Sequence, residues 1–360
     1  MIVKTSDLLD IYNNEIVKGV KNRKKILAFE KCKIEYLVYI KYILENNLYI
    51  KSNYNIFLVK DPKVRVVMSE SIIDKVINHY VAKYILIPKL SKYLCKEITA
   101  TRKGMGLTYA INLLLNNIEK LKYKSNNIYA LKIDIKKYFY SINHDILKSL
   151  IINEFTTDEY NLVCKLIDST NYEYINKKID ILEKSVNEKL PRYKNGVGLS
   201  LGGQVQQFFA IFYLYKLHHY IIHDLHLKYM LSYMDDYVIF SNDLDYLKIC
   251  KNKIIDFIHS YNLEINEKKT YIVNLKNGFN FLGYNFRIIN NKTIINLNEN
   301  ARNNIKKGIK KGIYRYQNNM ITFEKYFYSF EKYFYSFENY FHSYNFVNKD
   351  KIKHIIERYY

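Results

Sequence analysis

Apolar and polar residues alternate with a helical period over much of the 360-residue chain and with a strand-like period over shorter stretches. Near the N-terminus, apolar residues recur every three or four positions over 8–20 and 24–45, which predicts two helices. Two runs rich in β-branched and aromatic residues follow, at 54–59 and 64–68. Because Pro62 between them presets a turn, a β-hairpin is expected there.

Further helices and strands are expected along the rest of the chain. A polar segment at about 171–195, which contains Pro191, is interpreted as a variable excursion or flexible insertion. The glycines between 196 and 203 precede an apolar helix, a pattern typical of close approach of the backbone to a ligand or another segment. Helices are predicted from Ser69 or Ser71 through Tyr84, at 106–122, from Asn143, at 204–223, at 244–261 and beyond 298, and strands at 129–135, on both sides of Asp235 and around 281–284.

Residues 323–343 consist of three copies of one heptad. The copies begin at Phe323, Phe330 and Phe337, so these side chains share one helical face with the tyrosines three positions after each, Tyr326, Tyr333 and Tyr340. One interpretation is a packed helix whose sequence was duplicated by DNA slippage. The other is an aromatic face that contacts a nucleic-acid duplex or a partner helix.

Composition indicates a globular chain with a polyanionic partner. The chain is 49% hydrophobic and 16% aromatic, and its formal net charge is +21. Nucleic acid is the first candidate for such a partner, and the association should weaken as salt is added. The abundance of Lys, Asn, Ile and Tyr indicates an AT-rich genome, which accounts for part of the charge but not for the shortage of acids.

Cysteine usage and hydropathy bear on location. The four cysteines are widely separated and form no C-x-x-C pair, so neither a zinc site nor a disulfide framework is predicted. The N-terminus lacks an apolar signal core, and no run reaches about 18 apolar residues, so secretion and a membrane partner are not expected. These features predict a cytoplasmic protein.

Two adjacent acids, Asp235 and Asp236, lie between apolar runs that favour strands. Consecutive strand side chains point to opposite faces, so one charge would be buried unless the chain turns there or a cation compensates it. An ordinary Asp-containing hairpin turn explains the pair, and so does a divalent metal with oxygen ligands. If the strand that ends at Asp134 is a neighbour, three carboxylates converge, as two divalent ions need for in-line attack of a hydroxyl on a triphosphate.

From about residue 54 to residue 345 the chain resembles the bacterial reverse transcriptases in the order of its motifs. Tyr-Met-Asp-Asp at 233–236 is similar to the family's catalytic box, and the run from Asp134 to His144 is similar to its first carboxylate motif. The segment at 198–210 stands where the family has a loop and helix that contact template and nucleotide. The two motifs that follow the catalytic box are matched by 263–270 and 281–283.

The resemblance implies an α+β, right-hand polymerase fold and RNA-directed DNA polymerase activity. It implies N-terminal helices and fingers in 1–125, a palm in 126–290 with a finger-like insertion at about 171–195, and a helical thumb in 291–360. The implied substrates are dNTPs, a template RNA and a primer that grows into cDNA. Two Mg²⁺ ions, or Mn²⁺ in their place, would be held by Asp134, Asp235, Asp236 and the Ile135 carbonyl.

The same resemblance implies roles for further residues. Phe139 stands at the sugar-discriminating position, where a ring would collide with a 2′ hydroxyl and favour dNTPs, although it also suits a core aromatic position. His144 is interpreted as a structural histidine rather than a catalytic one. Nucleotide-binding roles are implied for Lys63, Arg65, Arg102, Lys103, Gln207 and Lys269, the last of which would protonate or stabilise the leaving pyrophosphate, and primer or template contacts for Gly202, Gly203, Gln204, Tyr233, Met234, Phe281, Leu282 and Gly283.

The subtype stays open between two groups. The closest resemblance is to the enzymes of diversity-generating retroelements, whose loop typically reads Leu-Pro-Ile-Gly-Asn-x-x-Ser-Gln. This chain keeps Gln207 but has Ser200, Gly203 and Gln206 in place of the Pro, the Asn and the Ser. The alternative is an antiviral defence reverse transcriptase that makes templated repeats or untemplated DNA. A small basic accessory protein or a homo-oligomer would suit either group.

Two other classes of protein are weighed. Palm carboxylates also serve RNA-dependent RNA polymerases and template-free nucleotidyl transferases, but Phe139 argues against ribonucleotides. A non-catalytic RNA-binding protein would gain nothing from three clustered acids that face a polyanion.

Overall fold

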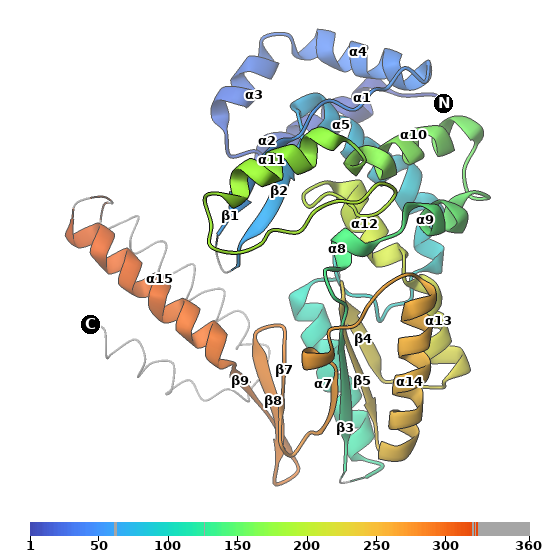
Figure 1. Ribbon diagram of the computed structural model, residues 1–360, viewed down its shortest axis with the longest axis vertical. Helices are drawn as coiled ribbons and strands as arrows, with labels where there is room; N and C mark the ends of the chain where they lie inside the picture. The colour runs from blue at the N-terminus through green and yellow to red at the C-terminus, as the bar shows by residue number, and fades with distance from the viewer. Residues whose placement is uncertain (61–62, 126, 319, 321, 323–360) are drawn as a thin grey trace.

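The computed structural model describes residues 1–60, 63–125, 127–318, 320 and 322 (Figure 1). The heptad repeat at 323–343 lies outside the described residues. Helices and antiparallel sheets are mixed along the described part, so the expected α+β class is confirmed. Among the residues that the structure describes, no helix is both long enough and apolar enough to cross a membrane.

The elements follow the chain order of Figure 1. The α-helices are α1 (Thr5–Ile11), α2 (Val17–Gly19), α3 (Arg23–Glu30), α4 (Lys33–Glu45), α5 (Ile72–Tyr80), α6 (Ile87–Leu90), α7 (Leu107–Lys122), α8 (Tyr138–Ser141), α9 (His144–Ile151), α10 (Thr157–Ile167), α11 (Glu173–Glu183), α12 (Gln204–Phe212), α13 (Tyr215–His219), α14 (Leu244–Ser260) and α15 (Glu299–Gln317). The strands are β1 (Asn55–Val59), β2 (Arg65–Ser69), β3 (Tyr129–Asp134), β4 (Met230–Tyr233), β5 (Asp236–Ser241), β6 (Tyr271–Asn274), β7 (Phe279–Phe281), β8 (Tyr284–Ile289) and β9 (Lys292–Leu297). Shorter π- and 3₁₀-helical turns are η1 (Tyr12–Ile16), η2 (Val81–Leu86), η3 (Ser91–Tyr93), η4 (Asp168–Thr170), η5 (Tyr220–Asp224) and η6 (Glu267–Lys269).

The two helices predicted near the N-terminus differ in how well they match the structure. The first is present, because α1 continues through η1 into α2. The prediction of a single helix over 24–45 is wrong, because Lys31 and Cys32 separate α3 from α4. With the chain turned there, Phe29 stacks on both Tyr12 and Tyr36, with ring centroids 4.7 and 4.9 Å apart. Aromatic stacking in the core thus overrides a continuous helical period.

The first predicted hairpin is present as β1 and β2, and it packs against the inserted segment. The prediction that 171–195 is a flexible excursion is wrong, because α11 lies within it. Ile175 and Ile179 of α11 are buried in a small core with residues of β1 and β2. Side chains four positions apart share one helical face, so a short amphipathic helix was concealed by the polar composition of the segment.

The central sheet has the strand order β4-β5-β3-β6, and each neighbouring pair is antiparallel. Val238 and Phe240 of β5 pack in one core with residues of α7, whereas Tyr237 and Ile239 pack in the larger core with residues of α14. Because successive strand residues point to opposite faces, α7 and α14 cover opposite sides of the sheet (Figure 1).

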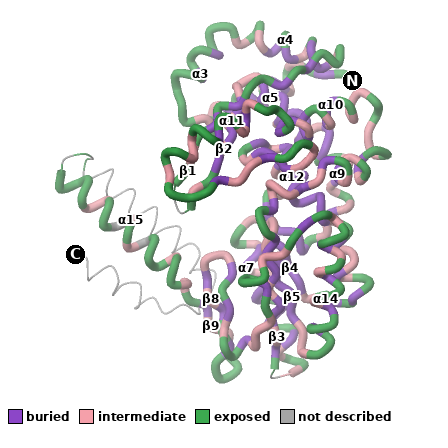
Figure 2. Tube along the Cα trace, viewed as in Figure 1, coloured by how far each residue is buried: buried purple, intermediate pink, exposed green. Residues whose placement is uncertain are grey.

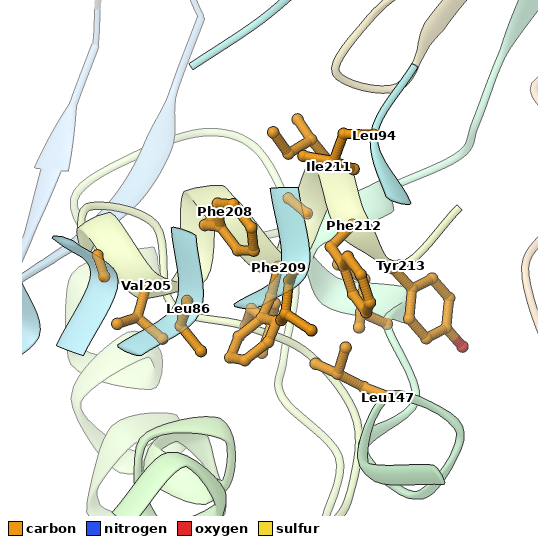
Figure 3. Close-up of a cluster of buried hydrophobic side chains, with 14 of the residues drawn as sticks. Leu86, Leu94, Leu147, Val205, Phe208, Phe209, Ile211, Phe212 and Tyr213 are labelled. Atoms are coloured by element: carbon orange, nitrogen blue, oxygen red, sulfur yellow. The ribbon is translucent and has the colours of Figure 1, made fainter. Parts of the chain in front are cut away.

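Helix α12 lies in the larger core and is apolar on nearly all sides. Figure 3 shows its side chains, among them Phe208, Phe209 and Phe212, interleaved with Leu86 and Leu147 from other helices. The helix predicted over 204–223 begins where expected but breaks between α12 and α13. Burial on all sides fixes α12 and therefore the glycine-rich loop that leads into it.

The described C-terminal part leaves the central sheet through a second, smaller sheet. Strands β7, β8 and β9 form it in that order, and α15 follows. The Asn298 side chain caps α15 by accepting a hydrogen bond from Ala301 N at 2.8 Å. Most described residues of α15 are exposed, as the green tube in Figure 2 shows.

Candidate active site

The Asp235-Asp236 pair lies at the tip of a tight hairpin. β4 ends at Tyr233, β5 begins at Asp236, and these two residues pair across the hairpin. Met234 and Asp235 form the loop, and Met234 has a φ of 57°, which is unusual for a residue with a side chain. The predicted hairpin with carboxylates at its tip is confirmed.

Asp134 lies on the neighbouring strand at the same level. β3 pairs antiparallel with β5, and the register sets Asp134 opposite Asp236. The two strands are therefore neighbours, as convergence of the three carboxylates requires. The Asp134 side chain is buried, and those of Asp235 and Asp236 are half-buried.

Burial and nearby negative charge make Asp235 and Asp236 costly to ionise. Burial, together with the charges of Asp236 and Asp134, raises the pKa of Asp235 to about 6. Burial also raises the pKa of Asp236, against the attraction of Lys132. Asp236 Oδ1 is buried and has no hydrogen-bond partner among the described residues. A cation close to this oxygen would offset the cost of burying it.

Two lysines lie against the carboxylates. Lys269 Nζ is 2.8 Å from Asp134 Oδ2, and Lys132 Nζ is 3.7 Å from Asp236 Oδ1. Burial opposes protonation of Lys269, but the hydrogen bond and charge of Asp134 outweigh it and raise the pKa of the ammonium group. Sequence reasoning missed Lys132, although its position two residues before Asp134 on a strand places both side chains on one face.

The carboxylates suit a divalent ion in chemistry but are not arranged around one in this conformation. Within the described ranges, no group of three or more His, Cys, Asp and Glu side chains is arranged to hold a metal ion. The donors are carboxylate oxygens, one of them buried without a hydrogen-bond partner among the described residues, and hard cations such as Mg²⁺ and Mn²⁺ prefer oxygen ligands. Asp134, Asp235, Asp236 and the carbonyl of Ile135 are the groups that would hold such ions.

A buried histidine, His218, contacts both strands of the β4–β5 hairpin. The ring of His218, on α13, stacks on Tyr237 with 5.2 Å between centroids. Its Nδ1 lies 2.6 Å from the Leu214 carbonyl oxygen, and its Nε2 lies 2.8 Å from Ser232 Oγ. Because a carbonyl only accepts, Nδ1 carries the proton and Nε2 accepts from the hydroxyl. Burial lowers the pKa of His218 to about 3, so the ring is neutral. These partners of His218 were not predictable from the local sequence pattern.

Acidification is expected to weaken the fold through His218. The unfolded imidazole takes up a proton near pH 6.5, whereas the folded ring resists protonation down to about pH 3. The stability that depends on this neutral ring is complete above pH 6.5 and falls by roughly 1.4 kcal/mol per pH unit below it. Between about pH 7 and pH 5, urea unfolding should show roughly 2 kcal/mol more loss for the unsubstituted protein than for His218→Gln.

The matched control for this experiment is His223→Gln, which removes an exposed histidine from the next turn. It should keep the pH dependence of the unsubstituted protein. Equal losses in the unsubstituted protein and in His218→Gln would contradict the burial of a neutral ring.

The glycine-rich loop is held by buried polar groups at its first end. Gly198 has a φ of 102°, and its carbonyl accepts hydrogen bonds from His144 Nε2 at 2.8 Å and Thr170 Oγ1 at 2.6 Å. His144 is fully buried and also lies 3.0 Å from an Asp168 carboxylate oxygen. These contacts fit the structural role expected for His144.

A second set of contacts holds the other end of the loop. The Asn78 side chain accepts from Val205 N at 2.8 Å and donates to Gln206 Oε1 at 3.1 Å. A Cβ atom on Gly203 would clash with Gln206 Oε1, so glycine at this position makes room for the contact. Gly202 is exposed and Gln204 is half-buried. The loop is therefore anchored at both ends while part of it faces outward.

Of the four cations expected to bind nucleotide in the first 125 residues, three are exposed and one is turned inward. Lys63 and Arg65 are exposed on the β1–β2 hairpin, and Lys103 is exposed in the turn before α7. Arg102 is turned inward, and its guanidinium donates to backbone carbonyls of Leu94, Cys95 and Ile98. Its side chain thus holds its own loop, whereas the other three cations face outward.

Phe139 connects the catalytic strand to the glycine-rich loop. Its backbone carbonyl accepts a hydrogen bond from Leu199 N at 2.7 Å, and its half-buried ring packs against the larger core. The Tyr138 and Phe139 rings meet edge to face, with centroids 6.1 Å apart. Gln207, one turn into α12, is also half-buried.

The expected primer-contacting turn joins β7 to β8. Phe281 is buried, and Leu282 and Gly283 both have left-handed φ values, 49° and 89°. The Gly283 carbonyl accepts from Asn298 N at 3.0 Å, which links this turn to the start of α15. The tight turn and the C-terminal helix are therefore positioned together.

Comparison with known proteins places the described site within one family model. The model for "Reverse transcriptase (RNA-dependent DNA polymerase)" matches residues 58–286. That range contains β3, the β4–β5 hairpin and the glycine-rich loop. None of the curated proteins compared with this chain matches it.

Three similar solved structures are telomerases of yeasts. Apo telomerase from Candida tropicalis truncated from the C-terminal domain is 15% identical, with a TM-score of 0.49, 74% of this chain covered and 60% of that chain covered. Apo telomerase from Candida tropicalis is 17% identical, with a TM-score of 0.44 and coverages of 66% and 47%. Telomerase from Candida albicans in complex with the TWJ fragment of telomeric RNA is 16% identical, with a TM-score of 0.45 and coverages of 68% and 45%. The chain thus spans 60% or less of the length of these solved chains.

Proposed function

The chain belongs to the reverse transcriptase family, and from this membership we propose that it copies an RNA template into cDNA by nucleotidyl transfer at Asp134, Asp235 and Asp236. The family's members are RNA-dependent DNA polymerases, and the antiparallel sheet between α7 and α14 is the palm of a right-hand polymerase fold. The observation that carries the proposal is the sheet register, which sets Asp134 opposite Asp236 at the tip that also bears Asp235.

In the proposed mechanism the carboxylates hold the metal ions, and Lys269 acts on the leaving pyrophosphate. Two divalent ions at the carboxylates and the Ile135 carbonyl would help the primer 3′ hydroxyl to lose its proton and would neutralise charge at the reacting phosphorus. Lys269, whose ammonium is kept protonated by Asp134, would donate a proton to the leaving pyrophosphate or stabilise its charge. Lys63 and Arg65, exposed on the hairpin, would attract the incoming triphosphate.

Phe139→Ala is expected to admit ribonucleotides. Removal of the ring opens the space that a 2′ hydroxyl would need, so discrimination against an rNTP should fall by roughly tenfold or more. Single-nucleotide extension with matched dNTP and rNTP measures this ratio. Phe139→Tyr keeps the ring and should keep the discrimination. An unchanged ratio in Phe139→Ala would show that the ring is only a core residue.

For the biological type, we propose a bacterial retroelement enzyme that resembles those of diversity-generating retroelements. The three departures from that group's loop pattern are buried. Ser200 accepts from the Tyr54 hydroxyl at 3.2 Å, Gln206 donates to the Leu166 carbonyl at 3.2 Å, and Gly203 leaves room for Gln206. Ser200 and Gln206 thus have partners elsewhere in the protein interior, so the departures do not alter the outward-facing part of the loop.

An antiviral defence enzyme that makes repeats or untemplated DNA is the second candidate, because the loop differs from the diversity-generating pattern at three positions. Sequencing the nucleic acid that copurifies with the protein from its native host, before and after addition of Mg²⁺ and dNTPs, tests both. A discrete RNA extended into complementary DNA supports reverse transcription, and adenine-linked errors in that DNA support the diversity-generating type. Repetitive or untemplated DNA favours the defence type. No DNA would contradict the proposal and favour an RNA-binding protein.

The proposed partners are template RNA, a primer or cDNA, and dNTPs, in the cytosol. The net charge of +21 supports a polyanionic partner, and all four cysteines are free thiols in the structure. A small basic accessory protein is a further proposed partner, and bound RNA would offset the repulsion between two proteins of net positive charge. Bound RNA would act in the same way in a homo-oligomer.

A further inference from the structure

A basic pocket lies outside the carboxylate cluster. It has a volume of about 440 Å³, which falls within the range of roughly 300–1,000 Å³ found for small-molecule sites. Three segments line it: the turn from β3 into α8, the loop that ends the insertion, and the turn after α14. Its charged lining consists of one carboxylate, Glu264, and four cations, Lys136, Lys137, Arg192 and Lys194.

Two of the four cations are already paired within the protein. Lys136 lies 2.9 Å from Glu264, and Arg192 pairs with Asp180 and Glu183 of α11. The hydrogen bond from Lys136 holds the pKa of Glu264 below its usual range, and Lys194 adds to this effect. The single carboxylate of the pocket is therefore ionised and already satisfied at neutral pH.

The other two cations, Lys137 and Lys194, are left for a ligand. Both are exposed, and neither forms an ion pair with any residue that the structure describes. They come from different segments, the β3–α8 turn and the loop that ends the insertion, so a single anion between them would be held from two sides. Ammonium groups form short, charge-assisted hydrogen bonds to phosphate oxygens. Polar side chains of Ser141, Asn143 and Asn262 also line the pocket.

The pocket shares backbone with the catalytic strand. Lys136 N donates to the Glu264 carbonyl at 2.8 Å, and Asn266 N donates to the Asp134 carbonyl at 2.7 Å. Lys137 follows Asp134 by three residues and has a left-handed φ of 48°, in the turn where the strand gives way to α8. A phosphate group that arrives at or leaves Asp134 therefore has a cationic pocket close by along the same chain segment.

From these observations we propose that the pocket binds the diphosphate group of a small phosphorylated molecule through Lys137 and Lys194. The source of that group is either free pyrophosphate or the triphosphate tail of a nucleotide. The assignment of these two sources rests on the proposed polymerase function, since both would be present during nucleotidyl transfer. Lys194 belongs to the inserted segment, so this chain's own insertion supplies half of the site.

Calorimetric titration of the full chain with inorganic pyrophosphate tests the pocket. A chelator is present so that no divalent ion carries pyrophosphate to the carboxylates. Lys194→Glu should weaken binding by roughly tenfold or more, because it replaces an attractive charge with a repulsive one. The side chain is exposed, and the Lys194–Val197 bridge is made by backbone atoms, so the variant keeps the fold.

The matched control is Lys189→Glu, which makes the same charge change on an exposed residue of the same segment outside the pocket lining. It should bind pyrophosphate nearly as tightly as the unsubstituted protein. Equal affinities for all three proteins, or absence of pyrophosphate binding to the unsubstituted protein, would overturn the proposal. A loss in Lys194→Glu that is confined to binding of an RNA oligonucleotide would also overturn it and would make this surface a nucleic-acid contact.

A second titration, with a non-hydrolysable dNTP analogue, separates the two sources. A parallel loss for the analogue in Lys194→Glu assigns the site to the triphosphate tail, and a loss for pyrophosphate alone assigns it to the free product. Neither titration requires DNA synthesis. Lys194-dependent binding in a protein that makes no DNA would therefore refute the proposed function while it supports the pocket.

Discussion

The double variant Asp235→Asn with Asp236→Asn is expected to lose DNA synthesis by about a thousandfold or more, because the groups that would hold two metal ions are removed. RNA binding should stay within roughly threefold of that of the unsubstituted protein, since the cationic surface is untouched and two negative charges near a polyanion are gone. Primer extension measures the first quantity, and filter binding at fixed salt measures the second.

The same variant is expected to be more stable than the unsubstituted protein. Burial raises the pKa of Asp235 to about 6, so an ionised carboxylate at neutral pH is held at a cost in free energy. Replacement by Asn removes that cost and should raise the free energy of unfolding by roughly 1–3 kcal/mol. A gain in stability together with a loss of synthesis would separate the role of these residues in chemistry from any role in folding.

Asp245→Asn is the matched control for the double variant. Asp245 lies on the exposed side of α14, where it pairs with Lys248 at 2.8 Å. The charge change per residue is the same, so synthesis should be retained. Synthesis retained in the double variant, or RNA binding lost together with synthesis, would refute the assignment of the carboxylates.

Gly198→Ala is expected to have the second-largest effect, on stability. A Cβ atom there would lie 2.8 Å from the Tyr193 ring and 3.3 Å from the Tyr140 backbone, and the φ of 102° disfavours any L side chain. The conformational cost of roughly 1–2 kcal/mol and the clash of roughly 1–3 kcal/mol should together lower the free energy of unfolding by about 3 kcal/mol. DNA synthesis should also fall, because the loop anchored by His144 would shift.

Gly196→Ala separates these two contributions. Gly196 also has a left-handed φ, 71°, but no atom lies within 4 Å of the Cβ position. Its substitution should therefore cost only the conformational part, about 1–2 kcal/mol. Urea unfolding of both variants measures the difference, and equal losses would mean that the close packing around Gly198 yields easily.

The catalytic hairpin was predictable because its sequence pattern is local. Two acids between apolar runs have few arrangements other than a turn, and the order of the surrounding motifs indicated which strand would be its neighbour. The register of Asp134 with Asp236 was beyond the sequence, because register is set by the pairing of whole strands. The strand period alone places Lys132 on the same face as Asp134, but the ion pair of Lys132 with Asp236 depends on this register.

Long-range contacts account for the other differences. The break between α3 and α4 allows Phe29 to stack on both Tyr12 and Tyr36. The spacing of apolar residues within 24–45 does not encode this contact. The resemblance implied that Arg102 binds nucleotide, but three carbonyls of its own loop accept hydrogen bonds from its guanidinium. The polar segment at 171–195 folds because β1 and β2 offer an apolar surface to Ile175 and Ile179. In each case a partner far along the chain, or a fold of the loop itself, decides the outcome.

RNA-templated primer extension by the purified protein, with sequencing of the product, tests the central claim most directly. A defined RNA with an annealed DNA primer is incubated with dNTPs and Mg²⁺, and the double Asp variant is run beside the unsubstituted protein. The expected result is DNA complementary to the RNA, made only by the unsubstituted protein and only with the divalent ion. Absence of extension, or DNA whose sequence does not follow the template, would contradict the assignment of this chain as an RNA-directed DNA polymerase.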